Sequence, residues 1–599
     1  EINCLFTADL RKSSQQIIHQ PLETIHNMKN IIFVVLIISL QYSCSSDSTI
    51  NNKENYTIYY NGEILTMEGD VPTYTEAVVV SDGQIIFIGE ELKAKNKFYG
   101  AQLYDLKGAT ITPGFIEPHL HPSLGSAMMN YEVIAPFDWV LPSGIKKGVK
   151  NHDEYIKAVE IAIKTKSKKE EIFFIWGYHQ LWHGDISREL LNEISGGHPV
   201  AIFHRSFHEI FLNDAAIDLI GISESDFSHN SQVVWKKGHF YEGGWLELVP
   251  HMAPILFDPE KYAFGLSEMT KLIEANGITT IAEPGFPSAS FDLEYSILKK
   301  EMTKSPFYDT YLIGNGTQLN RMKNGNENAL AFIEELSKSE QFSSKNLHFL
   351  PKQVKLFSDG AIYSQLMQMK EGYIDGHQGE WMTPLNVFSE QLKLYWKNNY
   401  KIHVHANGDL GIQRVIDLVR KLQNETPRKD HRLTIHHMGY FDDKIAQECK
   451  ELGIEASVNP YYLWALSDKY GEYGLGVERS ENLVAINSLV SKGIPVSFHS
   501  DFSMAPLAPL KLVWTAVNRI SANGNKYSQD QRIDVYNALK CITINAARTI
   551  NKENIIGSIK VGKQANFTIL DKNPINIKPE NIADIRIIGT IFYGRVNIL

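Results

Sequence analysis

Short apolar runs alternate with longer amphipathic stretches along the middle of the chain, from Pro113 to about Ile550. Eight apolar runs have the composition of buried strands, and they end near His121, Glu283, Gly316, Asp359, His405, His437, Pro460 and Asp501. Most are followed by helical periodicity, for example at Leu410–Gln423 and Asp442–Leu452. Eight βα units in series predict an α/β fold with a (β/α)8 TIM barrel over residues 113–550. In this fold the active site lies at the carboxyl ends of the strands.

The segments on either side of this region are rich in short strands and turns. Residues 56–112 contain strand-like runs at Thr57–Tyr60, Ala77–Val80 and Gln84–Gly89, with Asn61-Gly62 and Asp82-Gly83 as predicted hairpin turns. Residues 551–599 contain further runs at Gly557–Ile559, Ala565–Leu570 and Arg586–Phe592. We expect the two segments to assemble into one small β-sandwich domain.

The connection after the first barrel strand is unusually long, from His121 to about Gly277. It contains strand-like runs of its own, Ile172–Tyr178 and Pro199–Arg205. We expect residues from about 138 to 265 to form an inserted subdomain that covers the mouth of the barrel. Within it, His208 is a candidate for hydrogen bonding to a substrate, and a purely structural histidine is the alternative.

The pattern of the N-terminal residues indicates a targeting signal rather than a part of the folded domain. Residues 1–27 are polar and without pattern, and we interpret them as a non-native upstream extension. Residues 28–44 contain one cation and an apolar run, Ile31–Leu40, that is shorter than the roughly 20 residues of a membrane-spanning helix. This pattern is typical of a signal peptide. Because the segment ends in Leu40-Gln-Tyr-Ser-Cys44, it resembles a bacterial lipoprotein signal.

We therefore expect lipidation of Cys44, a polar linker over residues 45–55, and export with a lipid anchor to the bacterial cell envelope, in the periplasm or on the outer surface. The alternative is an ordinary cleaved signal, which also predicts export.

Composition narrows the class of function. The 599 residues include 59 Lys and Arg against 69 Asp and Glu, a net charge of −10 without a basic block, which argues against nucleic-acid binding. Four cysteines exclude a disulfide-rich scaffold. With 43% hydrophobic residues the chain has enough apolar side chains for a large core. We expect an enzyme with a small-molecule substrate, no membrane contact except a lipid anchor, and a monomeric or homodimeric assembly.

Metal-binding residue types stand at five of the eight strand ends. In Glu117-Pro-His119-Leu-His121, the two histidines are spaced i and i+2 and therefore face the same side of a strand. Imidazole is a good ligand for zinc and similar metals. An isolated pair of this kind is more often part of a core or a surface, but its position at the end of an apolar strand favours a metal site.

The fourth strand directs Lys355 into the barrel, because Val354 and Leu356 alternate with it. Lysine is rarely buried without a partner, and its ammonium group has no lone pair for a metal. Burial and neighbouring cations favour the neutral amine, which adds CO2 to form a carbamate that can bridge two ions. The alternative is a salt bridge between Lys355 and Asp359.

Three further strand ends offer ligands. On the fifth strand, alternation directs both His403 and His405 inward, and His405 is nearer the carboxyl end. On the sixth, His436 and His437 are adjacent, so alternation leaves open which of them faces inward. On the eighth, Asp501 faces inward and offers a carboxylate that binds metal and accepts a proton, although a helix cap is an equally common role.

Together these motifs resemble the amidohydrolase superfamily, in the amidohydrolase family 3 branch that includes N-substituted formamide deformylases. The similar segments are Thr112–His121, Lys355–Gly360, His405–Asp409, His437, Ser500-Asp501, Ala516–Arg519, Ser206–His208 with Leu212-Asn213, and Gly557–Lys563. The resemblance covers roughly Tyr56 to the C-terminus. It implies His437 rather than His436 as the ligand, and carboxylation of Lys355. Glu117, His436 and Asn566 each replace an acidic residue that is usual in the family.

The ligand set implies two divalent ions, expected to be zinc, bridged by N6-carboxylated Lys355. His119, His121 and Asp501 then hold one ion, and His405 and His437 the other. The expected reaction is hydrolysis of an amide-type C–N bond, in an N-acyl or N-formyl substrate, by a metal-activated hydroxide, with Asp501 as the catalytic base. Glu283, at the end of the second strand, is a candidate for an extra ligand, a substrate contact or a surface residue, and a substrate or ligand-orienting role is favoured.

Three alternatives stay open at this point. They are a mononuclear amidohydrolase with unmodified Lys355, an isomerase or lyase on the same scaffold, and a non-catalytic lipid-anchored binding protein with a degenerate metal site.

Overall fold

A computed structural model describes residues 55–599. The predictions for residues 1–54, including the signal peptide and the lipidation of Cys44, lie outside the described residues. Within residues 55–599, no helix combines the length and the apolar character needed to cross a bilayer.

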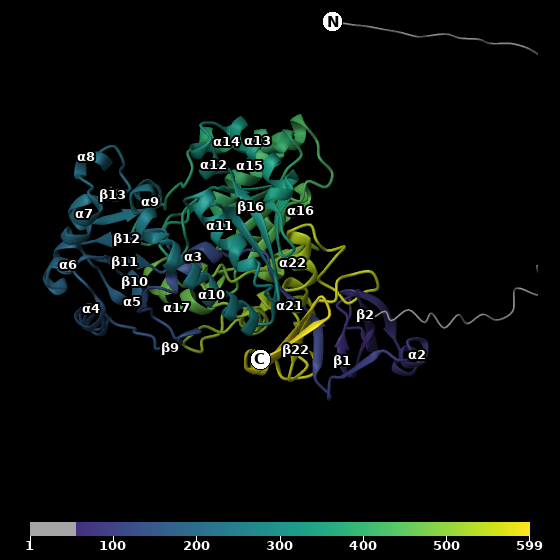
Figure 1. Ribbon diagram of the computed structural model, residues 1–599. Coiled ribbons are helices and arrows are strands. Elements are labelled where there is room, and N and C mark those ends of the chain that lie inside the picture. Colours follow the sequence, from purple (N-terminus) through teal and green to yellow (C-terminus); the bar gives the residue numbers. More distant parts are fainter. Residues whose placement is uncertain (1–54) are drawn as a thin grey trace, which may run out of the picture. The chain divides into compact units, whose positions relative to one another are not determined.

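The centre of the molecule is a parallel sheet that curves into a nearly closed barrel (Figure 1). In sheet order the strands are β21 (Val496–Phe498), β20 (Glu455–Val458), β19 (Thr434–His437), β18 (Lys401–Ala406), β17 (Leu347–Phe357), β16 (Asp309–Asn315), β15 (Ile278–Phe286) and β6 (Phe115–Glu117). Every neighbouring pair in this order is parallel. The predicted α/β TIM-barrel fold is therefore confirmed.

Helices follow the barrel strands and cover the sheet. The two helices predicted after the fifth and sixth strands are α15 (Asp409–Glu425) and α16 (Asp443–Leu452). α15 buries Ile412, Val415 and Val419, whose spacing of three to four residues places them on one face. α16 begins where the Asp442 side chain accepts a hydrogen bond from the Ile445 amide, and it ends at Gly453, which has a φ of 70°.

Strands from both ends of the chain share one eight-stranded sheet. Its order is β24 (Arg595–Ile598), β23 (Ile587–Phe592), β22 (Phe567–Leu570), β5 (Thr110–Pro113), β1 (Thr57–Leu65), β2 (Tyr74–Ser81) and β3 (Gln84–Gly89), and β4 (Gln102–Asp105) pairs with β1. The two segments join where β22 runs antiparallel to β5. An apolar core that includes Tyr59, Ile111 and Phe567 contains residues from both segments.

Two local predictions in this sheet were wrong. The Asn61-Gly62 pair does not form a hairpin turn, because β1 continues through it to Leu65 with an irregularity in its pairing to β2 between Tyr60 and Ile64. Residues 557–559 are not a strand. The Asp82-Gly83 turn is confirmed: Ser81 pairs with Gln84, and both turn residues have positive φ angles, 48° and 76°.

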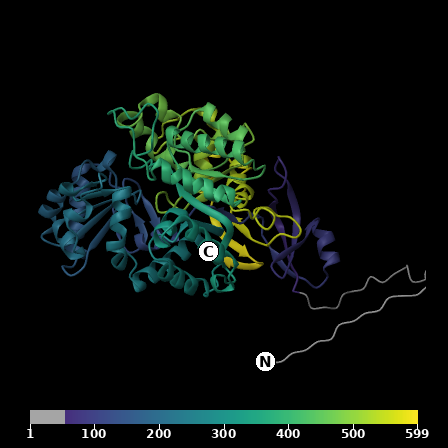
Figure 2. The same cartoon turned by 90° about the horizontal axis from the view of Figure 1, so that it is seen from above.

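The long connection after β6 contains a separate sheet. Its order is β13 (Val233–Val234), β14 (His239–Tyr241), β12 (Glu209–Leu212), β11 (Val200–His204), β10 (Phe173–Tyr178) and β7 (Glu132–Val133). β10 and β11 correspond to the two strands predicted there. Both ribbon views show these elements on one side of the barrel and the sheet of β1 and β2 on the other (Figures 1 and 2). α9 (Gly243–Leu256) and α10 (Pro259–Ala275) lead back to β15.

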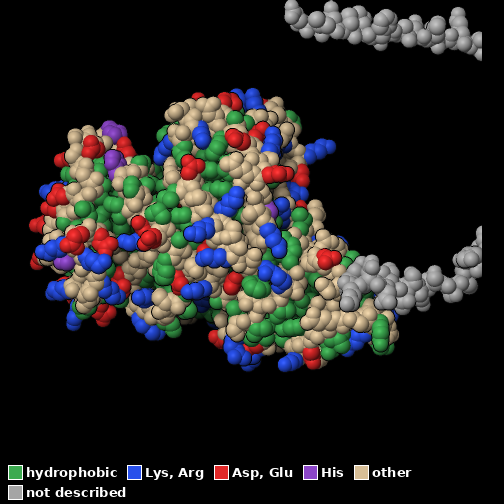
Figure 3. All heavy atoms as spheres, in the orientation of Figure 1, with side chains coloured by type: hydrophobic (Ala, Val, Ile, Leu, Met, Phe, Trp, Pro, Cys, Tyr) green, Lys and Arg blue, Asp and Glu red, His purple; other side chains and the backbone are tan. Residues whose placement is uncertain are grey.

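Charged side chains of both signs are interspersed over the face shown in Figure 3.

Candidate metal centre

Three of the predicted ligands, His119, His121 and His437, gather around a fourth, Asp501. Nε2 of His119 lies 3.1 Å from Nε2 of His121. Each of these nitrogens lies 3.3 Å from Oδ1 of Asp501. On the other side of the carboxylate, Nδ1 of His437 lies 3.6 Å from Oδ2. These side chains come from the ends of β6, β19 and β21, which the closing of the barrel brings together.

The local backbone at these positions is specialised. β6 ends at Glu117, so His119 and His121 lie beyond the strand, and His121 directly precedes α3 (Pro122–Met128). The amide of His121 donates to the carbonyl of Phe502, 3.3 Å away, which ties the end of β6 to the segment after β21. Asp501 and His437 have φ angles of 56° and 79°, in the left-handed region that such residues seldom adopt. Unfavourable conformations of this kind concentrate at functional sites.

Lys355 and His405 complete the set from β17 and β18. The Lys355 side chain is buried, and its Nζ has no hydrogen-bond partner. The ring of His405 lies 4.4 Å from that of His437, measured between ring centroids. Lys355, His405, His437 and Asp501 all line one cavity, together with His119 and His121.

Burial sets the protonation of most of the cluster. It holds the pKa values of His119, His405 and His437 well below the usual range, so their imidazoles are neutral and keep a lone pair. Burial also lowers the pKa of Lys355 to about 7. His121 differs: burial alone lowers its pKa, but hydrogen bonds to Asp501 and Glu283 outweigh this effect and raise the pKa to about 9.

The donor set fits a divalent ion. Ligand atoms of His119, His437 and Asp501 are buried and lie within 4.8 Å of one another. Nε2 of His437 and Nζ of Lys355 are buried without a hydrogen-bond partner, and Oδ1 of Asp501 makes no polar contact beyond those at 3.3 Å with the imidazoles of His119 and His121. Because an unpaired buried polar atom costs free energy, such atoms in one cluster are typical of a site that receives a ligand.

The two residues with predicted substrate roles, His208 and Glu283, differ in their position relative to the cavity. His208 lies on the cavity wall, where its Nδ1 is 2.8 Å from Oε2 of Glu242. Glu283 is fully buried, and its Oε1 is 3.4 Å from Nδ1 of His121. Of the roles considered for Glu283, this position supports orientation of His121.

Sequence reasoning left three histidines without a role in the site. His403 and His436 form a buried chain with His119: Nδ1 of His119 is 2.7 Å from Nδ1 of His436, and Nε2 of His436 is 2.8 Å from Nδ1 of His403. Nε2 of His403 is 2.8 Å from Oε1 of Gln353, whose Nε2 donates to the carbonyl of Ile550.

The third histidine is His499. Its Nε2 lies 3.3 Å from Nδ1 of His437, and its ring stacks on that of His119. The alternation of β18 predicted that His403 faces inward, but no sequence signal indicated which residues it contacts. His436 and His437 both face the interior, because the left-handed φ of His437 breaks the alternation.

Glu117 was noted in the sequence only as a departure from the family pattern. It is buried, and its Oε2 accepts a hydrogen bond from the amide of Ser500, 2.9 Å away. Burial raises its pKa to about 8. The contact joins the first and last strands of the barrel directly beside Asp501.

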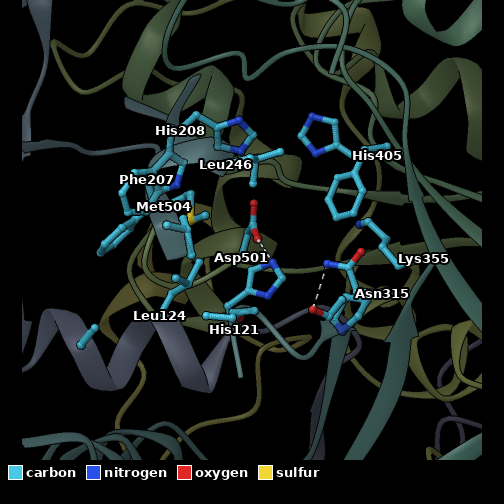
Figure 4. Close-up of a pocket in the computed structure, with 18 of the residues that line it drawn as sticks. His121, Leu124, Phe207, His208, Leu246, Asn315, Lys355, His405, Asp501 and Met504 are labelled. Carbon is cyan, nitrogen blue, oxygen red and sulfur yellow. Dashed lines mark hydrogen bonds and ion pairs between the residues drawn. The ribbon is translucent and has the colours of Figure 1, made fainter. Parts of the chain in front are cut away.

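The cavity has a volume of about 150 Å³ and lies between the barrel and the insert. In Figure 4, Lys355 and Asn315 lie on one side of Asp501, and Leu124, Phe207 and Met504 lie on the other. His121 lies below the carboxylate in this view and Leu246 above it.

Buried imidazoles, a lysine and a carboxylate at the carboxyl ends of a (β/α)8 barrel define a barrel enzyme with a candidate divalent-metal centre. Residues 102–598 match the amidohydrolase family, and the chain therefore belongs to this family. The resemblance proposed from the sequence is confirmed, and membership supports assignment as a hydrolase.

Relatives of similar length match nearly the whole chain. The Bacillus subtilis protein YtcJ is 24% identical over 567 residues, which cover 90% of this chain and 98% of the relative. The N-substituted formamide deformylase of Arthrobacter pascens is 22% identical over 544 residues, which cover 87% of this chain and 94% of the relative. Among solved structures, an uncharacterized metal-dependent hydrolase from Pyrococcus horikoshii has a TM-score of 0.67 and 19% identity, and the match covers 88% of this chain and 99% of the other.

Proposed function

We propose that this protein hydrolyses an amide-type C–N bond, such as that of an N-acyl or N-formyl amine, at the cluster around Asp501. The observation that carries the proposal is the pair of buried atoms without a hydrogen-bond partner, Nζ of Lys355 and Nε2 of His437, beside the Asp501 carboxylate in a cavity with room for a small molecule. Membership of the amidohydrolase family supports it. So does the similarity to an enzyme named N-substituted formamide deformylase.

Two divalent ions, which we propose to be zinc, fit this donor set. His119, His121 and Asp501 would hold one ion and His405 and His437 the other, with carboxylated Lys355 shared between them. When bound, such ions act as Lewis acids that activate water and polarise a carbonyl group.

Carboxylation of Lys355 requires the neutral amine, which burial favours. The amine nitrogen bonds to the carbon of CO2, one proton leaves, and the product is a carbamate anion with two oxygens. The buried Nζ has no hydrogen bond that would compete with this reaction.

Asp501 is the proposed acid and base. Its carboxylate faces the cavity between His119, His121 and His437, within reach of a water molecule that attacks a bound amide. It accepts the proton that this water loses and returns it to the leaving nitrogen, so that one carboxylate serves both proton transfers.

Asp501→Asn tests this assignment. The amide keeps one oxygen ligand but is too weak a base to accept the proton, so we expect metal to be retained and turnover to fall by at least about 100-fold. The measurements are metal per chain by elemental analysis and hydrolysis of N-formyl and N-acyl amines, on protein that begins at Ser45. Asp375→Asn, an exposed carboxylate, is the control. Full activity of Asp501→Asn would refute the role.

Counting metal in the wild-type protein tests the number of ions. About two ions per chain support the binuclear site, about one supports the mononuclear alternative, and none supports a non-catalytic binding protein.

We also propose that the protein is exported and anchored through lipidated Cys44, on the basis of the sequence of residues 28–44. Mass spectrometry of the mature N-terminus tests this proposal directly. Cys44→Ala should move the protein from the membrane fraction to the soluble fraction, and an unmodified Cys44 within an uncleaved chain would contradict it.

A further inference from the structure

The cavity beside Asp501 extends into an apolar chamber between α3, α9 and β11, with Leu124, Phe203, Phe207, Trp245, Leu246 and Phe257 on its wall. The aromatic side chains are in mutual contact: the Phe203 ring lies 4.9 Å from that of Phe207 and 5.2 Å from that of Trp245, measured between centroids. The insert supplies most of this wall. The chamber is therefore part of the same enclosed space as the metal cluster.

The chamber has no free charge to offer a ligand. Outside the metal cluster, the titratable side chains on the cavity wall are Tyr131, His208 and Glu242. Burial raises the pKa of Tyr131, which is therefore neutral. His208 and Glu242 neutralise each other, because Nδ1 of His208 is 2.8 Å from Oε2 of Glu242. Oε1 of Glu242 accepts a further hydrogen bond from the amide of Ala361, 3.0 Å away. A charged group that entered the chamber would lose its hydration without gaining a partner.

We propose that the apolar chamber binds an uncharged alkyl or aryl substituent of the substrate while its amide group lies at Asp501. This inference rests on the proposed function and narrows it: the substrates are amides with a hydrophobic substituent, and amides with an ionised substituent are excluded. Because burial of each methylene contributes about 0.8 kcal/mol, kcat/KM should rise about three- to five-fold per methylene until the chamber is full.

Matched amides test this inference on the metal-loaded protein that begins at Ser45. N-formylbutylamine and N-formyl-4-aminobutyrate have the same chain length and differ by a terminal carboxylate, and the 2-phenylethyl analogue adds an aromatic ring. We expect kcat/KM for the butyl and phenylethyl compounds to exceed that for the carboxylate compound by at least about 50-fold. Comparable values for the butyl and carboxylate compounds would overturn the inference and leave the proposed function standing.

Two variants test whether the substrate preference depends on the residues of the chamber. Trp245→Ala should lower the preference for the phenylethyl compound over N-formylmethylamine by at least about five-fold, and Trp235→Ala, in the insert but not on the cavity wall, should not change it. Leu246→Arg introduces a cation and should shift the preference towards the carboxylate compound by about ten-fold or more. Unchanged preferences in both chamber variants would contradict the assignment.

If the wild type hydrolyses no amide, binding of amides to Asp501→Asn tests the chamber separately from the proposed hydrolase activity. Calorimetry with N-(2-phenylethyl)acetamide should show binding at least about ten-fold tighter than with N-acetyl-4-aminobutyrate. This result without hydrolysis by the wild type would support the chamber and refute the hydrolase, and equal affinities would refute the chamber.

A second inference follows from the buried chain His119–His436–His403–Gln353. Its terminal hydrogen bond fixes the direction of all the others. Nε2 of Gln353 donates to the carbonyl of Ile550, so Oε1 of Gln353 accepts from Nε2 of His403. Nδ1 of His403 is then an acceptor for Nε2 of His436, and Nδ1 of His436 is an acceptor for Nδ1 of His119.

We infer that Gln353 holds His119 in the tautomer with hydrogen on Nδ1, which leaves the lone pair of Nε2 directed at Asp501 and His121. Gln353, His403 and His436 are thus positioning residues that prepare His119 as a ligand through three consecutive hydrogen bonds. Residues that orient a ligand in this way typically change metal affinity by 10- to 100-fold when they are replaced.

The test compares Gln353→Met, which removes the acceptor, with Gln353→Glu, which keeps it. Gln391→Met, at another buried glutamine, is the control. We expect Gln353→Met to weaken zinc binding at least about ten-fold in competition with a chelator, and Gln353→Glu to stay within about three-fold of the wild type. Wild-type zinc affinity in Gln353→Met would overturn the inference.

The tautomers of the metal-free wild-type protein provide a readout that needs no variant. In protein labelled with 15N-histidine, His119 should carry its hydrogen on Nδ1, and His403 and His436 should carry theirs on Nε2. A hydrogen on Nε2 of His119 would contradict the assignment.

Discussion

Lys355 shows how burial changes the chemistry of a single side chain. It lies on β17 between Val354 and Leu356, which are both fully buried, and its amine faces the cluster rather than water. Lysine in water is a cation that repels metal ions. Within the barrel burial lowers the pKa of the amine to about 7, so the neutral form that the proposed carboxylation requires is accessible near neutral pH.

We predict that Lys355→Ala binds at most one divalent ion per chain and hydrolyses amides at least about 100-fold more slowly. The shortened side chain leaves space beside the histidines, so propionate should enter and restore part of the activity as a substitute carboxylate. Metal analysis and rate measurements with and without propionate check this. Lys352→Ala, an exposed lysine of the same strand, should behave like the wild type, and loss of activity without any rescue by carboxylates would argue against a carbamate.

At the level of elements, β16 is joined to the sheet of the two chain ends through Asp309. Its Oδ2 accepts a hydrogen bond from the hydroxyl of Tyr593, 3.1 Å away, and its Oδ1 is buried without a partner. Burial raises the pKa of this carboxyl group from 3.8 to about 7. The folded protein therefore holds a proton on Asp309 that the unfolded chain releases near pH 4.

This shift predicts the pH dependence of stability. Because the folded pKa is above the unfolded one, the contribution of Asp309 is fully present below about pH 4 and is lost as the pH rises to about 7. Asn cannot ionise, so Asp309→Asn should gain stability relative to the wild type across this range, by up to about 4 kcal/mol at the plateau. Denaturant unfolding at pH 5 and pH 7.5 measures it, and a difference between the two proteins that does not grow with pH would contradict the prediction.

Much of the site could be predicted because strand alternation is a local property. Lys355 and Asp501 were placed inside the barrel from the parity of their neighbours, and both face the cavity. The same rule gave no answer for His436 and His437, because the φ of 79° at His437 is a backbone feature that alternation does not encode. The prediction of a hairpin turn at Asn61-Gly62 was wrong for a related reason. The pair is compatible with a turn, but the pairing with neighbouring strands keeps it within β1.

Contacts between distant residues were beyond sequence reasoning. The histidine chain links positions 119, 403 and 436, and Glu117 reaches Ser500 across 383 positions. Such pairs depend on the stagger of barrel strands and on side-chain rotamers, which a single sequence does not reveal. The insert was predicted as a cover of the barrel mouth, but the apolar character of the chamber depends on residues of α3, α9 and β11 that are far apart in the sequence.

At the scale of the whole molecule, we predict that ion binding and folding are coupled, because the proposed ligands come from five different strand ends. Removal of metal by a chelator should lower the thermal midpoint of unfolding, and added zinc should restore it in a concentration-dependent manner. A free metal concentration 100 times Kd adds about 2.7 kcal/mol to the free energy of unfolding. Calorimetry of the two forms measures the shift. In His119→Gln the shift should be much smaller, and an equal shift in this variant would place the ion elsewhere.

The hydrogen bond between Glu117 and Ser500 joins residues from the two ends of the barrel sequence, so it can form only late in synthesis. The ribosome has to complete most of the polypeptide before the last barrel strand can pair with the first. β22, which pairs with β5, is synthesised later still. A stalled or truncated product therefore lacks the enclosed cluster, however well its early strands have formed. If the proposed ions bind, they can do so only in a finished chain, and bound metal would then report complete synthesis.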